Sequence, residues 1–156
     1  DRYRRSLYTF WKRTLPPPSM QTFDAPTREF CVMQRSRTNT PLQALVLQND
    51  PTFVEAARFI AQRLLTELDG GASPEARAAY AFRLVTGRAP TAEERATLVA
   101  LYRDQRAQFA GDAESVRALL GVGDGVHPAD LDRRDLAAWA IVASVLLNLD
   151  EAVTKS

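Results

Sequence analysis

The chain changes character near residue 35, and everything beyond that point has the hydrophobic periodicity of helices. Thr40 precedes Pro41, and Gln43 follows three residues after Thr40, which is a capping box with proline at the first helical position. This pattern predicts a helix from about Pro41 to Gln48. Asp50 and Pro51 repeat the cap-plus-proline signal and predict a second helix. Its apolar face comprises Val54, Ala57, Ala61, Leu64, Leu65 and Leu68, and Gly70–Gly71 ends it.

Further helices are predicted by the same kind of signal. They open at Ser73-Pro74, at Thr91 with Glu94, and at Asp112, and they end near Gly87, Phe109 and Leu120 respectively. The stretch DLAAWAIVASVLLNL is apolar nearly all round but is too short to span a bilayer, so it predicts a buried central helix. The stretch GVGDGVHPAD before it is glycine-rich and is expected to be a flexible loop.

The first 34 residues are an aromatic and proline-rich arm. SLYTFWKRT suits either a short strand or one to two helical turns, and the two alternatives stay open. LPPPSM is expected to be extended, because consecutive prolines fix φ and disfavour helix in the residues before them. Its apolar anchors are Tyr8, Phe10, Trp11, Met20, Phe23 and Phe30. We expect this arm to pack onto the helical domain or onto missing upstream domains, with Cys31 as a small buried hydrophobe.

These patterns predict an all-α protein, a compact bundle of five to six helices with an irregular N-terminal arm. The expected division is an arm over residues 1–34 and a helical domain over residues 35–156. A chain of 156 residues with 46% hydrophobic residues is adequate for one such core. The start of the chain carries no initiator Met and no signal-peptide pattern. We therefore expect an excised piece of a longer protein.

Charge is unevenly distributed along the chain. Residues 1–40 contain eight Arg or Lys and three Asp or Glu, whereas residues 41–156 contain twelve and sixteen, so the two parts carry +5 and −4. A basic arm indicates either an anionic partner or an arm that lies on the acidic body of its own domain. Aromatic residues between the arginines are also found in proteins that stack bases. The near-neutral net charge of +1 argues against a nucleic-acid partner.

Residue types exclude several kinds of chemistry. The chain has one His, His127, and one Cys, Cys31, whereas zinc and iron sites need several such ligands. We predict no metal site, and without Cys-x-x-Cys-His no covalently attached haem, so no cofactor is expected in this chain. No phosphate-binding loop, dinucleotide fingerprint or serine-nucleophile motif occurs. Catalytic residues therefore cannot be named from the sequence.

The remaining candidate is a polar segment, Arg35–Thr40, with Asp50 beyond it. One interpretation is an anion or sugar site, in which two arginine forks stand before the free N–H groups of a helix start. The candidate ligand-binding residues are then Arg35, Arg37, Asn39 and Asp50. The alternative is structural, with Thr40, Asn49 and Asp50 serving as helix caps and the arginines binding backbone carbonyls.

Five blocks of the sequence resemble a known family. They are RRSLYTFWKRTLPPPSM, FDAPTREFC, RTNTPLQALVLQNDPTFVEAAR, GRAPTAEE and ASVLLNLDE. Together they resemble, over essentially the whole chain, a planctomycete-specific family, domain of unknown function 1553. The resemblance implies the C-terminal region of an exported, extracytoplasmic protein, in which an upstream domain often carries haem c. It supplies no catalytic residues.

Two functions are expected from this combination. The first is a non-catalytic accessory or interaction domain of a cytochrome c-linked planctomycete protein, which binds a ligand or partner at the Arg35–Thr40 region. Its partners would be upstream domains of the same polypeptide or a redox protein. The second is part of an extracytoplasmic enzyme that acts on a polymer such as a polysaccharide, with Asp24 or Glu29 also lining a cleft. An open pocket with convergent polar groups would favour the enzyme.

Overall fold

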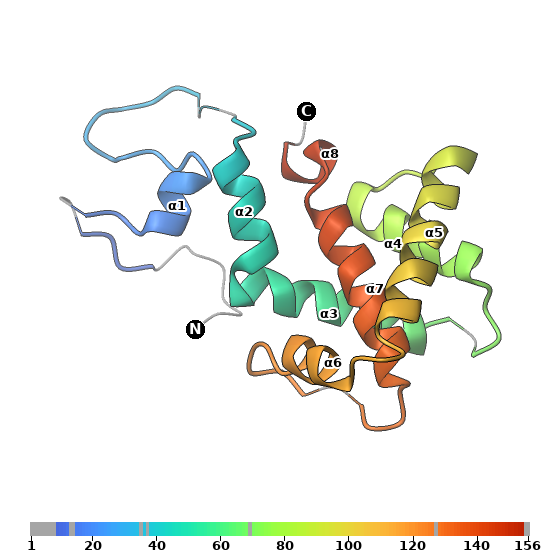
Figure 1. The fold of residues 1–156 in the computed structure, drawn as a ribbon. Coiled ribbons are helices and arrows are strands. Elements are labelled where there is room, and N and C mark those ends of the chain that lie inside the picture. The colour runs from blue at the N-terminus through green and yellow to red at the C-terminus, as the bar shows by residue number, and fades with distance from the viewer. Residues whose placement is uncertain are drawn as a thin grey trace.

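A computed structural model describes residues 9–12, 15–34, 36, 38–68, 70–126 and 128–154. In this part of the chain the secondary structure is helical, apart from an isolated bridge between Lys12 and Leu15 (Figure 1). The helices are α1 (Pro18–Thr22), α2 (Pro41–Asn49), α3 (Pro51–Thr66), α4 (Pro74–Thr86), α5 (Ala92–Gln108), α6 (Ala113–Leu120), α7 (Arg133–Leu147) and α8 (Asp150–Val153). The all-α fold class is confirmed. The structure describes eight helices rather than the expected five to six, and the two short helices α1 and α8 account for the difference.

Side-chain caps fix the starts of the long helices. Thr40 and Gln43 form the predicted capping box at α2, and Thr91 and Glu94 form the other at α5. Other cap side chains accept backbone N–H groups at the starts of α3, α4, α6 and α7; they are Asp50, Ser73, Asp112 and Asp132. Gly87 ends α4 in the left-handed region, with φ 83°, which glycine adopts without steric cost. The starts of α2 to α7 are therefore locally encoded.

The extended conformation expected for LPPPSM is wrong in its second half. Pro18 begins α1, and the N–H groups of Met20 and Gln21 donate to the Pro17 carbonyl. Proline is disfavoured inside a helix but is compatible with its first position, where no N–H partner is needed. The run of prolines thus ends in a helix start.

The core is built around α7, which lies among α3, α4, α5 and α6 (Figure 1). The fully buried positions of α7 include Leu136, Trp139, Val142 and Leu146, in agreement with the central helix predicted from its apolar sequence. The Trp139 ring stacks on Tyr102 of α5, with 4.4 Å between ring centroids and 18° between ring planes. Such stacking adds to the apolar area that both rings bury.

The core also holds an ion pair that the hydrophobic pattern does not reveal. Glu55 and Arg58 of α3 are only 2% and 3% exposed, and the Arg58 guanidinium lies 3.2 Å from the Glu55 carboxylate. Arg58 also donates to the Leu120 carbonyl at the end of α6, over 3.1 Å. The Glu55 carboxylate accepts the N–H of Gly125. One buried pair therefore joins α3, α6 and the loop that follows α6.

Gly123 and Gly125 of that loop lie so close to side chains of α3 that a Cβ atom would not fit at either position. A Cβ atom at Gly123 would lie 2.4 Å from the Glu55 side chain, and φ there is +89°. A Cβ atom at Gly125 would lie 2.5 Å from the Phe59 ring. The expectation of a flexible loop is thus incomplete, because its first half is held against α3 by close backbone approach. His127 lies outside the described residues.

Two features are absent from the described ranges. No helix there has the length and apolar character needed to cross a bilayer. No group of three or more His, Cys, Asp or Glu side chains is placed there to hold a metal ion.

Candidate functional site

The arm is fastened to α2 by the buried side chain of Gln43, which is 1% exposed. Its amide nitrogen donates to the Thr22 carbonyl over 2.8 Å and to the Thr38 hydroxyl over 3.0 Å. Its amide oxygen accepts the N–H of Thr40 over 3.0 Å. A residue that the sequence indicates only as a capping partner therefore also holds the end of α1.

Asp24 completes this connection from the arm side. One of its carboxylate oxygens accepts both the backbone N–H and the hydroxyl of Thr38, each over 2.8 Å. The same oxygen lies 3.5 Å from the Gln43 amide nitrogen. Asp24 adopts φ 57°, a left-handed conformation that Asp tolerates better than most residues. We call Thr22, Asp24, Thr38 and Gln43 the arm latch.

Of the candidate ligand-binding residues, the structure describes Asn39 and Asp50, and the two contact different helices. Asn39 donates to the Asp150 carboxylate of α8 over 2.7 Å. Asp50 accepts the N–H of Thr52 as the cap of α3. Arg35 and Arg37 lie outside the described residues. The described hydrogen bond of Asn39 therefore joins this segment to α8.

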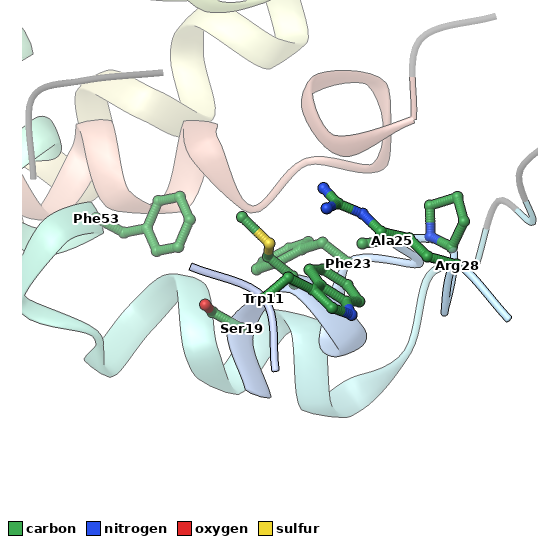
Figure 2. Close-up of a pocket in the computed structure, with 8 residues that line it drawn as sticks. Trp11, Ser19, Phe23, Ala25, Arg28 and Phe53 are labelled. Carbon is green, nitrogen blue, oxygen red and sulfur yellow. The ribbon is translucent and has the colours of Figure 1, made fainter. Parts of the chain in front are cut away.

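A groove lies between the arm and α3, beside the arm latch. Its volume is about 760 Å³, and it is lined by Trp11, Ser19, Met20, Phe23, Ala25, Pro26, Arg28 and Phe53. Figure 2 shows Trp11, Phe23 and Arg28 on the arm side and Phe53 reaching from α3. The rings of Phe23 and Phe53 meet with centroids 5.7 Å apart. Arm and body thus each supply part of one apolar surface, which we call the arm groove.

Polar groups in the arm groove are few. The Arg28 guanidinium lies over the Trp11 ring, 4.7 Å from its centroid, in cation–π geometry. Arg28 adopts φ 66°, an uncommon conformation for a long side chain. The indole nitrogen of Trp11 is buried and finds no hydrogen-bond partner among the described residues. The lining supplies aromatic surface and one cation, with no Asp, Glu, His or Cys among its members.

A second, smaller cavity continues from the arm groove. Its volume is about 400 Å³, and Phe23 and Phe53 line both cavities. It is otherwise lined by Leu47, Ile60, Leu84, Val85, Leu147, Ala152 and Val153. The two cavities therefore share the Phe23 and Phe53 rings as part of their walls, and the second cavity extends to α8.

Three described arm residues that were expected to pack, Phe10, Phe30 and Cys31, are exposed. Cys31 is exposed, so its interpretation as a small buried hydrophobe is wrong. Phe30 beside it is 69% exposed. Both follow Arg28 in an irregular segment that leaves the arm groove, whereas Trp11, Met20 and Phe23 line it. Aromatic content indicated that the arm packs, but the sequence could not identify which aromatic residues do so.

Comparison with known proteins supplies a family. The sequence profile of a family described as protein of unknown function (DUF1553), PSD1, matches residues 1–102. The chain belongs to the DUF1553 family. No curated protein and no solved structure matches it. The whole arm groove falls inside the region that matches DUF1553, whereas α6, α7 and α8 lie beyond it.

Within the DUF1553 match, the GRAPTAEE block forms an ion-pair cluster. Arg88 donates to the Glu94 carboxylate over 2.7 Å and to the Glu151 carboxylate over 2.9 Å, and it lies 4.6 Å from the Phe82 ring centroid. Hydrogen bonds from Arg88, and then from the Thr91 backbone, lower the pKa of Glu94 to about 2. The same two carboxylates raise the pKa of Arg88. This cluster holds the start of α5 against α8.

Proposed function

We propose that this DUF1553 chain is a non-catalytic interaction domain that binds an apolar segment of a partner polypeptide in the arm groove. The observation that supports the proposal is the groove's composition, with Trp11 and Phe23 from the arm facing Phe53 from α3. Aromatic anchors in concave apolar surfaces are the usual centres of protein recognition. A volume of about 760 Å³ suits a few side chains of an extended segment.

The polar features of the groove suit a peptide. Arg28 at the groove is a donor for carbonyl or carboxylate oxygens of the bound segment. The Ser19 side chain also lines the groove. In a bound peptide, the apolar side chains would contact the aromatic lining of the groove, and a main-chain carbonyl would accept a hydrogen bond from Arg28. We therefore expect the partner segment to carry an acidic residue next to its apolar anchors.

A polysaccharide-cleaving enzyme is less well supported. Most glycoside hydrolases use two carboxyl groups that flank the scissile bond. The described lining of the arm groove contains none. Asp24 is engaged by Thr38, and Asp50 caps α3. The side chains of Asp24, Asn39 and Asp50 thus make structural hydrogen bonds, which suits a binding surface better than proton transfer.

Peptides that tile the parent polypeptide outside this chain provide a direct test. Calorimetric titration is expected to find a binding peptide, and Phe53→Ala is expected to weaken its binding at least tenfold, the equivalent of about 1.4 kcal/mol, because an aromatic anchor is lost. Phe30→Ala is the matched control, since Phe30 lies in the arm but outside the groove. Circular dichroism checks the fold of each variant. Equal effects of the two substitutions, or no binding by any peptide, would contradict the proposal.

We place the partner segment in the same polypeptide, within an exported planctomycete protein whose upstream part carries haem c. Support comes from the sequence resemblance alone. The absorption spectrum of the intact parent protein is expected to show a haem Soret band that this chain lacks. A parent protein without that band would remove the link to electron transfer, while the peptide-binding proposal would remain.

A further inference from the structure

The second cavity, which shares the Phe23 and Phe53 rings with the arm groove, differs from it in chemistry. Its volume is about 400 Å³. Besides the two rings, its lining consists of aliphatic side chains from α2, α3, α4, α7 and α8; they are Leu47, Ile60, Leu84, Val85, Leu147, Ala152 and Val153. The arm groove has Arg28 and Ser19 in its lining, whereas the described lining of the second cavity contains no polar side chain. Such a lining selects an apolar group, because a polar group would lose its hydrogen bonds to water there.

One wall of the second cavity is α8, and polar contacts fix the position of this short helix. Asn39 donates to the Asp150 carboxylate over 2.7 Å. Arg88 donates to the Glu151 carboxylate over 2.9 Å. Both contacts come from segments distant in sequence, one before α2 and one after α4. The two apolar residues that α8 contributes to the cavity are therefore held in place from two sides.

The two cavities lie close enough together for neighbouring residues of one bound segment. The ring centroids of Phe23 and Phe53 are 5.7 Å apart, and both rings are walls of both cavities. In an extended segment, residues i and i+2 point to the same side and lie about 6–7 Å apart, at about 3.3 Å per residue. Adjacent residues point to opposite sides. A spacing of two residues therefore suits one anchor in each cavity.

We propose that the second cavity is a specificity subsite, which takes a second apolar side chain of the segment bound in the arm groove, two residues from the first anchor. This inference rests on the proposed function and adds a sequence pattern for the partner, two apolar residues separated by one residue. Continuity of the cavities supports this occupant, because Phe23 and Phe53 contact both anchors. The apolar lining of the second cavity excludes a charged residue at the second anchor position.

Three synthetic peptides of one length test the proposal. Each contains one Phe and one Asp in a serine background. The first has no other apolar residue, the second carries a Leu two positions from the Phe, and the third carries the same Leu directly beside the Phe. NMR titration is expected to show that the second peptide binds at least tenfold more tightly than the third, because only its Leu points to the same side as the Phe.

Intermolecular nuclear Overhauser contacts identify which cavity each anchor occupies. Met20 lines the arm groove and not the second cavity, whereas Val85 and Val153 line the second cavity and not the arm groove. The Phe ring of every peptide is expected to contact the Met20 methyl group. The Leu methyl groups of the second peptide are expected to contact the methyl groups of Val85 and Val153.

A substitution that fills the second cavity provides an independent readout. Ala152→Leu is expected to remove the tenfold advantage of the second peptide over the third, because the larger side chain occupies the space of the second anchor. Ala100→Leu is the matched control, since Ala100 is exposed on α5 and lies outside both cavities. Circular dichroism checks the fold of both variants.

The outcomes separate the subsite from the proposed function. Equal binding of the second and third peptides, with the Phe ring in contact with Met20, would overturn the subsite and leave the arm groove as a binding site. So would the absence of contacts from the Leu methyl groups to Val85 and Val153 in the wild type, whether or not Ala152→Leu folds. If neither these peptides nor those of the parent polypeptide contact Met20, the proposed function itself is contradicted and the subsite with it.

Discussion

Arg58→Met is expected to lower the free energy of unfolding by about 3–5 kcal/mol, the range observed when one member of a buried ion pair is removed. Arg58 is 3% exposed, and its guanidinium lies 3.2 Å from the Glu55 carboxylate. Its loss leaves a carboxylate in the interior without that cation, and it removes the donor to the Leu120 carbonyl. Urea denaturation of the wild type and the variant measures the change.

The same helix supplies a matched control. Arg63 pairs with Glu67 over 2.7 Å, but these side chains are 48% and 41% exposed. Arg63→Met is therefore expected to lower the free energy of unfolding far less than Arg58→Met does, because exposed ion pairs contribute little to stability. Similar losses for Arg58→Met and Arg63→Met would show that burial of the Glu55–Arg58 pair does not dominate its energetics.

A double substitution distinguishes charge burial from simple loss of packing. Glu55→Gln with Arg58→Met leaves no charge at the site, and the Gln side chain still carries an acceptor for the N–H of Gly125. The double variant is expected to be more stable than Arg58→Met alone. If it is less stable, the cost of Arg58→Met comes from lost contacts to α6 rather than from the remaining carboxylate.

Sequence predicted the helical part of the fold well because its signals are local. Thr40, Asp50, Ser73 and Thr91 each cap the helix that they were predicted to start. Such residues act on N–H groups two or three positions away, so neighbouring residues suffice to predict them. The short helix α1 is not predicted from the sequence, because three consecutive prolines indicate an extended chain. Pro18 is nevertheless compatible with a helix, since it occupies the first position of α1.

Sequence could not predict contacts between distant segments. Glu55 and Arg58 are charged residues of an amphipathic helix, and their pattern assigns them to the solvated face as readily as to the core. Contacts with residues more than sixty positions later, the Leu120 carbonyl and the N–H of Gly125 among them, enclose the pair. The arm groove is another such case, since Trp11 and Phe53 become neighbours through the path of the arm. The burial of these residues depends on packing between distant segments, which the hydrophobic periodicity of the sequence does not reveal.

The ligand-binding interpretation of the polar segment stays a prediction, because Arg35 and Arg37 lie outside the described residues. Its predicted members Asn39 and Asp50 hold α8 and α3, while the connection to the arm runs through Thr38 and Gln43. A capping glutamine can be predicted from spacing, whereas its second hydrogen bond to the Thr22 carbonyl depends on where α1 ends. The proposed binding function depends on the arm latch, because the arm groove forms only while these hydrogen bonds hold the arm against α2.

Gln43→Ala is expected to lower the free energy of unfolding by about 2–3 kcal/mol and to release the arm. The substitution removes the donor to the Thr22 carbonyl and the Thr38 hydroxyl, and the acceptor for the Thr40 N–H. It also leaves a cavity at a side chain that is 1% exposed. Gln48→Ala is the matched control, since Gln48 is exposed on the same helix and the change in helix propensity is the same.

Hydrogen exchange separates release of the arm from general destabilisation. The Thr38 N–H donates to Asp24, so its exchange is expected to accelerate in Gln43→Ala, as is that of Ala25, whose N–H donates to the Met20 carbonyl. Amides of the central helix around Trp139 are expected to keep protection in proportion to global stability. Peptide binding in the arm groove is expected to weaken in parallel, because Trp11 and Phe23 leave their positions opposite Phe53. Unchanged exchange at Thr38 would show that the arm stays in place without Gln43 and that the latch depends on Asp24 alone.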